Sequence, residues 1–281
     1  MFPVRFMCRY LHVCRSSYYR WKHNPISKRA RQDIDLTSYI KHIFTEGRAT
    51  YGSRTIKHKL LQNGFIVSRR RISRLMMQAG LHCKTKQKFK RTTDSNHSFY
   101  VAPDRLKRNF NPAKPNNVWA GDITYIPTGN GFLYLATVMD LYSRKIVGWS
   151  MKNHMKAELV NNALTMALFK RKPPKGLIWH TDRGSQYCAT SHRNIVKDHG
   201  ILQSMSRKGN CWDNAPAESF FSILKRELGT MNQFHNQKQA AAHIFEYIEV
   251  FYNRIRAHST IGYLSPEQFE NIPNPYQKIV G

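Results

Sequence analysis

Apolar residues in the first third of the chain recur every three or four positions, which is the period of an amphipathic helix. Three helices are predicted, with inward-facing series Leu36, Ile40, Ile43 and Phe44, then Ile56, Leu60 and Leu61, then Ile72, Leu75, Met76 and Ala79. Ser53 and Ser68 stand where N-caps are expected, and Gly47, Gly64 and Gly80 stand where the helices should stop. Three short helices with tight connections fit a small all-α helix-turn-helix domain.

From Val118 onward, short apolar runs are separated by turn residues, a pattern typical of strands. It predicts strands over 118–126, 132–139, 145–151, 177–180 and 201–205, with helices over 159–168 and 191–199. The first three strands are joined by short turns and must be antiparallel neighbours, whereas helices separate the later ones. The expected fold class is therefore α/β, with a mixed five-stranded sheet flanked by helices.

The balance of charge is strongly basic, with 45 Lys and Arg against 17 Asp and Glu, a formal net charge of +28. Residues 1–112 carry a net charge of +20 and residues 113–281 carry +8. Such a chain is expected to bind nucleic acid phosphates. Composition and pattern divide it into a basic N-terminal segment 1–27, a helix-turn-helix domain 28–91 expected to bind DNA, a linker 92–112 and an α/β core 113–275 that can host chemistry needing carboxylates.

Membrane and disulfide-rich classes are excluded. The longest clean apolar run, Phe132 to Met139, is far shorter than the about 18 residues that a membrane span needs. The five cysteines form neither a Cys-x-x-Cys pair nor a Cys/His set with zinc-finger spacing. We expect a cytoplasmic protein with reduced thiols, no zinc and no membrane partner.

Four arginines, Arg69, Arg70, Arg71 and Arg74, fall on the first turn and a half of the third helix. A recognition helix meets the major groove of DNA at this position. The alternative is a solvated basic face on a small bundle. DNA contact is favoured because four arginines with no acid among them would repel one another if left unpaired.

Three carboxylates stand out in this acid-poor chain: Asp122 inside the first strand, Asp182 just beyond the fourth, and Glu218 on a helix after the last strand. If the first and fourth strands are neighbours, Asp122 and Asp182 lie side by side and Glu218 can be brought over them. Converging carboxylates need cations, and oxygen ligands suit Mg²⁺. Two such ions, with Mn²⁺ as a possible substitute, would support in-line phosphoryl transfer.

Each acid also has a simpler explanation. Asp182 precedes Arg-Gly, and turn formation alone would explain an aspartate at this position. Glu218 cannot complete a capping box because Ala215 stands three residues earlier, but it could complement the helix dipole. Asp122 is hardest to dismiss, since an acid in a buried strand is costly unless paired. The competing acids Asp140 and Asp213 stand at a turn and at a helix entry, where turn and cap residues belong.

Five ordered strings now match a known family: WAGDITYI, ATVMDLYSRKIVGW, HTDRGSQY, SMSRKGNCWDNAPAESFFSILKREL and YNRIRAHSTIGYLSPEQF. With 35 residues between Asp182 and Glu218, they resemble the B-frame transposases of the IS-three insertion-sequence family, relatives of retroviral integrases. The segments YGSRTIKHKL and RISRLMMQAG resemble the helix-turn-helix that precedes the core in that family, so the resemblance covers nearly the whole chain.

The resemblance implies a ribonuclease-H-like integrase core with Asp122, Asp182 and Glu218 as catalytic metal ligands. It also implies that Lys225, two helical turns after Glu218, meets transposon-end DNA. From the sequence alone, Lys225 would more often be an ordinary exposed lysine. The family implies bacterial, nucleoid-associated action, homo-oligomers on DNA, and an upstream A-frame protein joined as a fusion by ribosomal frameshifting.

The predicted function is transposition of an insertion sequence: DNA cleavage at the element's ends, then strand transfer into a target duplex. A DNA-binding regulator without its own strand-transfer activity, or a nuclease that cuts without joining, are the alternatives. The Arg-His-Arg-Tyr set of a tyrosine recombinase has no recognisable counterpart. Trp212, in a glycine-containing basic loop before the Glu218 helix, either stacks on an unpaired base or packs over the helix start.

Overall fold

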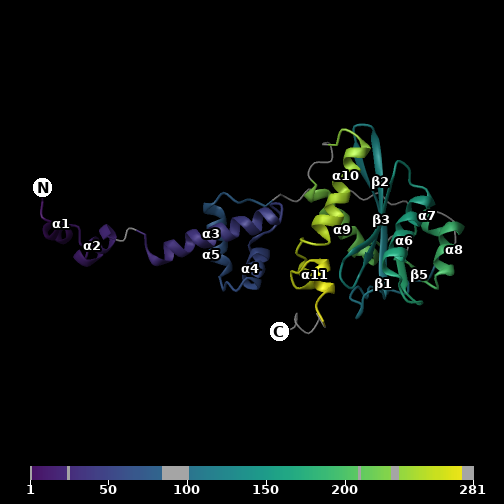
Figure 1. Cartoon of the computed structure of the whole chain (residues 1–281), viewed down its shortest axis with the longest axis horizontal. Helices are drawn as coiled ribbons and strands as arrows, with labels where there is room; N and C mark the ends of the chain where they lie inside the picture. Colours follow the sequence, from purple (N-terminus) through teal and green to yellow (C-terminus); the bar gives the residue numbers. More distant parts are fainter. Residues whose placement is uncertain (1, 24–25, 84–100, 208–209, 229–233, 274–281) are drawn as a thin grey trace. The chain divides into compact units, whose positions relative to one another are not determined.

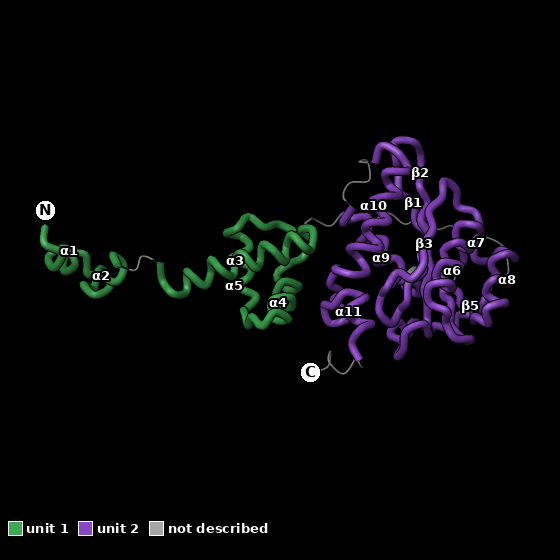
Figure 2. The backbone as a smooth tube through the Cα atoms, in the orientation of Figure 1, with its two compact units in different colours: residues 1–83 green, residues 84–281 purple. Residues whose placement is uncertain are grey.

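The computed structural model describes residues 2–23, 26–83, 101–207, 210–228 and 234–273. It divides into two compact units, Met1–Cys83 and Lys84–Gly281 (Figure 2). The described part of the first unit is helical, and the second unit is α/β. No helix in these ranges is both long and apolar enough to cross a bilayer.

Three helices, α3 (Lys28–Glu46), α4 (Ser53–Gln62) and α5 (Arg69–Gln78), form the bundle predicted from the helical periodicity. Their apolar stripes meet in a core that includes Ile40, Ile56, Leu60 and Ile72. Ser68 caps α5 as expected, accepting a hydrogen bond from Arg71 N at 3.3 Å. Ser53 lies in the first turn of α4 instead, behind Gly52 at the N-cap. Leu61, predicted to face inward, is exposed.

Two further helices, α1 (Val4–Tyr10) and α2 (Arg15–His23), occupy the segment for which only a basic character was expected. Their apolar residues do not form one inward stripe, and most remain exposed. The start of α3 was also missed: Ser27 caps it by accepting from Ala30 N at 3.1 Å. The helix thus begins in a polar stretch where apolar spacing gives no signal.

The second unit is built on the predicted mixed sheet, with strand order β3-β2-β1-β4-β5. The strands are β1 (Val118–Thr128), β2 (Gly131–Asp140), β3 (Ile146–Lys152), β4 (Ile178–Thr181) and β5 (Leu202–Met205). The first three pair antiparallel, and β4 pairs parallel with both β1 and β5. The sequence prediction of a mixed five-stranded sheet is confirmed.

Helices cover both faces of this sheet (Figure 1). One face packs against α6 (Ala157–Arg171), α7 (Ser185–Cys188) and α8 (Thr190–Asp198). The other packs against α9 (Ala215–Glu227), α10 (Gln237–Glu246) and the π-helical η3 (Tyr247–Tyr252). Short elements η1 (Cys211–Asn214), η4 (Ser259–Ile261) and α11 (Pro266–Glu270) complete the unit. Alternation along β1 sends Trp119 into the first core and Val118 and Ala120 into the second.

The expected linker 92–112 is only partly described. Residues 84–100 lie outside the described ranges. Residues 101–112 follow the second unit closely: Ala102 and Leu106 are buried, and Arg105 N donates to Ser204 Oγ at 2.9 Å. The stretch directly before the sheet is therefore part of the α/β unit's packing.

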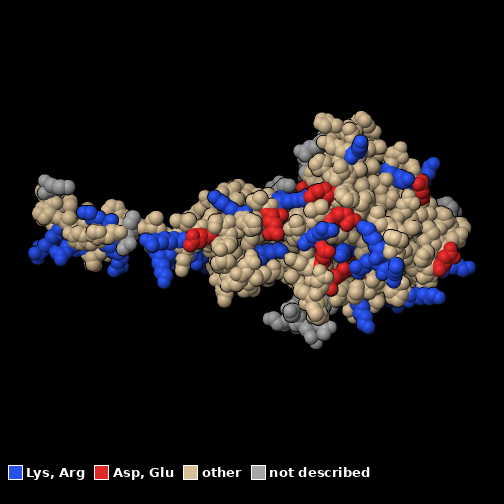
Figure 3. Space-filling view, in the orientation of Figure 1, with Lys and Arg blue, Asp and Glu red and all other residues tan. Residues whose placement is uncertain are grey.

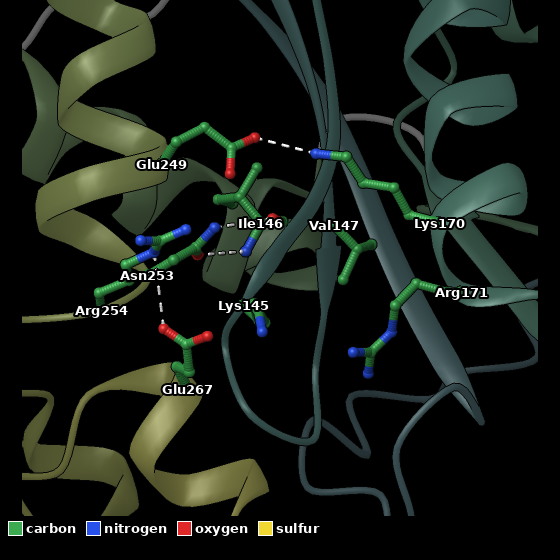
Figure 4. A pocket seen from close by; sticks show the side chains of 9 residues that line it. All are labelled: Lys145, Ile146, Val147, Lys170, Arg171, Glu249, Asn253, Arg254 and Glu267. Carbon is green, nitrogen blue, oxygen red and sulfur yellow. Dashed lines mark hydrogen bonds and ion pairs between the residues drawn. The ribbon is translucent and has the colours of Figure 1, made fainter.

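A cavity of about 250 Å³ marks where the C-terminal helices meet the edge strand β3 and the end of α6 (Figure 4). Asn253 pairs with the backbone of Ile146 in both directions, accepting from its N at 2.9 Å and donating to its O at 3.0 Å. Lys170 bridges to Glu249 at 3.0 Å beside them. The Asn253 amide therefore joins the C-terminal helices to β3, and the Lys170–Glu249 pair joins them to α6.

Candidate active site

Asp122 lies in the middle of β1, opposite Thr137 of β2 and two residues beyond the last β1 residue that pairs with β4. By alternation it shares the sheet face of Val118 and Ala120, which is the face that α9 covers. Its side chain is half-buried, and Ile123 N donates to its Oδ1 at 2.8 Å. The carboxylate therefore emerges from the sheet directly beneath the helix that carries Glu218.

Asp182 follows β4 immediately. The parallel register pairs Trp119 with Trp179 and Ala120 with His180, and its continuation by two residues places Asp182 beside Asp122. Asp182 Oδ1 also accepts from Gly184 N at 2.9 Å, so the residue does form the turn expected of an aspartate before Arg-Gly. Its position beside Asp122 comes in addition to that turn.

Glu218 stands in the first turn of α9 and is exposed. The entry to α9 is fixed by the buried Asn214, whose Nδ2 donates to the carbonyl oxygen of Gly121 at 3.2 Å. Only glycine fits at position 121, because the Trp179 ring occupies the space that a Cβ would need. The helix of Glu218 thus begins against the residue that precedes Asp122.

The electrostatics link the three acids. Burial raises the pKa of Asp122 well above its usual value, and the charges of Asp182 and Glu218 raise it further. Lys225 opposes this rise. A cluster of like charges that makes ionisation costly is one that a cation would stabilise.

Lys225 is buried, with 8% of its surface exposed, and the expectation of an ordinary exposed lysine is wrong. Its Nζ lies 4.8 Å from the centroid of the Tyr125 ring, which faces it from β1. Burial lowers the pKa of Lys225 to about 8, while Asp122 acts in the opposite direction. The ammonium therefore belongs to the carboxylate site.

The acids do not form a closed ligand set. In the part of the chain that the structure describes, no group of three His, Cys, Asp or Glu side chains could hold a metal ion as placed. The donor chemistry nevertheless suits a hard divalent cation, because all three candidates are carboxylates and one has a strongly raised pKa. Glu218 lies exposed in the first turn of α9, and its charge contributes to the raised pKa of Asp122.

The competing acids are held by other groups. Asp140 ends β2 and begins the expected turn, accepting from Tyr142 N at 3.0 Å, and it also bridges to Arg171 at 3.2 Å. Asp213 caps no helix; it bridges to Arg207 at 2.9 Å and to Arg108 at 2.8 Å. These arginines hold its pKa well below the usual range.

Comparison with known protein families identifies the domains of this chain. An integrase core domain model matches residues 112–211, a second integrase core domain model matches residues 218–272, and an HTH-like domain model matches residues 30–89. An insertion element IS600 protein of Shigella sonnei, described as an uncharacterized 31 kDa protein, is 48% identical over 94% of this chain and 97% of its own length.

Transposase InsF for insertion sequence IS3A, from Escherichia coli K12, is 41% identical over 96% of this chain and 94% of its own length. The chain belongs to the IS3 family of transposases. Among solved structures, a chain of the simian T-cell lymphotropic virus intasome matches with a TM-score of 0.50 at 16% identity, over 79% of this chain and 72% of that one. This likeness concerns the fold.

IS3-family membership makes this chain a transposase, a polynucleotidyl transferase that acts on DNA. The residues predicted to contact DNA differ in their exposure and in their ion pairs. Arg71 and Arg74 both bridge to Asp33 of α3 at 2.7 Å, so the premise that the arginine cluster lacks an acid is wrong. Arg69 and Arg70 are exposed. Trp212 is 69% exposed, so it does not pack over the start of α9.

Proposed function

We propose that Asp122, Asp182 and Glu218 bind divalent cations and carry both the cleavage and the strand-transfer steps of transposition. The observation that supports this most directly is the parallel pairing of β1 with β4, whose register sets Asp122 beside Asp182 on the sheet that α9 covers. Two Mg²⁺ ions, or Mn²⁺ in their place, would activate an attacking oxygen and stabilise the leaving one when bound.

The protein's own groups set up the reaction around that site. Asp122, Asp182 and Glu218 would hold the divalent cations, and those cations would bind and polarise the phosphodiester. Lys225, desolvated beside Tyr125 and Asp122, offers a positive charge to a DNA phosphate entering the site. Asn214 keeps the entry of α9 in register with β1.

The chemistry needs no energy source. In the first step a water oxygen attacks a phosphodiester at the element's end, the P–O3′ bond breaks, and a free 3′ hydroxyl remains. In the second step that 3′ oxygen attacks a phosphodiester of the target, forming one P–O bond while another P–O3′ bond breaks. One ester replaces another, and no side chain becomes covalently attached.

The remaining assignments follow the same proposal. Residues 28–91 would grip element DNA, with Arg69 and Arg70 free for phosphates and Arg71 and Arg74 shared with Asp33. The exposed Trp212 would stack on an unpaired base near the cut. The transposase would work in the bacterial cytoplasm as a homo-oligomer bridging element ends and target, alone or fused to an upstream A-frame protein.

The test is an assay on DNA. Duplexes that bind the full chain are selected from a random pool, and the selected duplexes are then labelled and incubated with target DNA in Mg²⁺. Asp182→Asn should lose cleavage and strand transfer together while keeping DNA binding. Asp198→Asn, which removes one exposed carboxylate from α8, should behave as wild type.

Three results would contradict the proposal. Near-normal strand transfer by Asp182→Asn would show that Asp182 is not a catalytic residue. Binding by the wild type without any product would favour a regulator, and nicks without joined products would favour a nuclease.

A further inference from the structure

The N-terminal helices α1 and α2 have almost no core of their own. Among the described residues 2–23, Cys8 is the one buried side chain, and α2 buries none. Large apolar groups stand in solvent instead: Tyr10 is 76% exposed and Trp21 is 64% exposed. Helices this short are marginal in water, so a partner surface must help to order them.

The two helices are joined as in a helix-turn-helix. Four residues, 11–14, separate α1 from α2. Val13 N donates to the carbonyl oxygen of Cys8 at 2.9 Å, and His12 takes a left-handed φ of 52°. Tyr18 N donates to the carbonyl oxygen of Cys14 at 3.1 Å, which starts α2. A short tight connection of this length is characteristic of the DNA-binding motif.

The charge of the segment points to the partner's chemistry. Residues 1–23 contain five cationic side chains and no Asp or Glu, and the cations are Arg5, Arg9, Arg15, Arg20 and Lys22. Figure 3 shows Lys and Arg without Asp or Glu over this segment on the visible face. A surface of one sign, with aromatic rings between its cations, complements a polyanion better than it complements a mixed protein surface.

The face of α2 turned away from its half-buried Tyr18 carries donors for DNA. Helical periodicity places Ser16, Arg20 and His23 opposite Tyr18. Arg15 and Ser17 complete an exposed, polar first turn. In helix-turn-helix proteins, the N-terminal residues of the second helix contact base edges while the first helix crosses the backbone.

We propose that α1 and α2 form a second DNA-reading element, with α2 entering the major groove of duplex DNA at a site separate from that read by α3–α5. This rests on the proposed function, because it requires the chain to bind element DNA. The HTH-like domain match begins at residue 30 and does not include these helices. The element ends would therefore contain two sequence blocks, one for each helical group.

The experiment uses the full chain. Duplexes are selected from a random pool by wild type, by Arg15→Ala/Arg20→Ala, and by Lys172→Ala/Lys175→Ala, which removes the same charge from an exposed loop of the second unit. Circular dichroism confirms folding of each variant. The affinity for one wild-type-selected duplex is then measured against salt concentration, and the oligomeric state by light scattering.

Wild type should select a site with two blocks, of which the α2 variant loses one and the loop variant loses none. In the α2 variant, the negative slope of log K against log salt should become shallower by about 0.9 for each phosphate contact removed. An unchanged motif and slope in the α2 variant would overturn the inference, as would an equal loss in both variants. A changed oligomeric state with unchanged selection would make α1–α2 a protein interface. A wild type that selects no DNA would refute the proposed function as well.

Discussion

Replacing Lys225 with methionine removes a charge that the fold buries beside Asp122. The folded protein holds the pKa of Lys225 at about 8, against an ordinary value of 10.5. Between these values the unfolded chain binds a proton that the folded chain does not, so the wild type becomes more stable as pH rises. A difference of this size corresponds to about 2.5 kcal/mol gained between pH 7 and pH 10.

The measurement is urea unfolding of both proteins in EDTA from pH 7 to pH 10. Trp119 and Trp179, both buried in the second unit, report its unfolding by fluorescence. Most other groups titrate equally in the two proteins. The exception is Asp122, whose pKa Lys225 lowers, so the difference in unfolding free energy reports the titration of this coupled pair. Wild type should gain on Lys225→Met by about 2 to 3 kcal/mol over this range. A difference that stays constant with pH would refute the buried, desolvated placement of Lys225.

Three other substitutions have defined outcomes. Asp213→Asn removes the carboxylate that pairs with Arg108 and Arg207 in the turn before α9. Strand transfer, measured by gel assay, should fall about 10- to 100-fold, which is the usual loss when a residue that orients a metal ligand is replaced. Asp198→Asn is the control and should be unaffected. Glu227→Ala leaves Arg256 buried without its partner, and denaturant unfolding should show a loss of about 3 to 5 kcal/mol; a loss under 1 kcal/mol would contradict the buried pair. Burial lowers the pKa of His192 to about 4. From pH 7 to pH 4.5 the wild type should therefore lose about 2 to 3 kcal/mol more unfolding free energy than His192→Asn, and an equal loss in both proteins would contradict this.

The sheet and the bundle were predictable because local signals agree with tertiary structure there. The turn residues around β1, β2 and β3 and the helical stripe of α6 are complete within short windows of sequence. The sequence left open whether β1 and β4 are neighbours, and the structure shows that they pair in parallel. The closeness of Asp122 and Asp182 had been expected only on that condition. Local pattern was weakest where a helix lacked an apolar stripe, as in α1, α2 and the first turns of α3.

The partners of charged groups were not predictable, since they come from distant sequence. Arg71 meets Asp33 from 38 residues away, and Arg108 meets Asp213 from 105 residues away. Helical spacing placed Lys225 on the same helix face as Glu218. The contact of Lys225 with Tyr125 of β1, about 100 residues earlier in the chain, could not be predicted from that spacing. Such contacts are set by packing, which periodicity alone does not encode.

The central claim is that Asp122, Asp182 and Glu218 hold the catalytic cations. The most direct test is anomalous X-ray diffraction from crystals of the full chain bound to selected DNA and soaked in Mn²⁺. We expect an anomalous peak between the carboxylates of Asp122 and Asp182, with Glu218 turned toward it, and its loss in Asp122→Asn crystals. Anomalous peaks only at other carboxylates, such as Asp140 or Asp213, with none between Asp122 and Asp182, would contradict the claim.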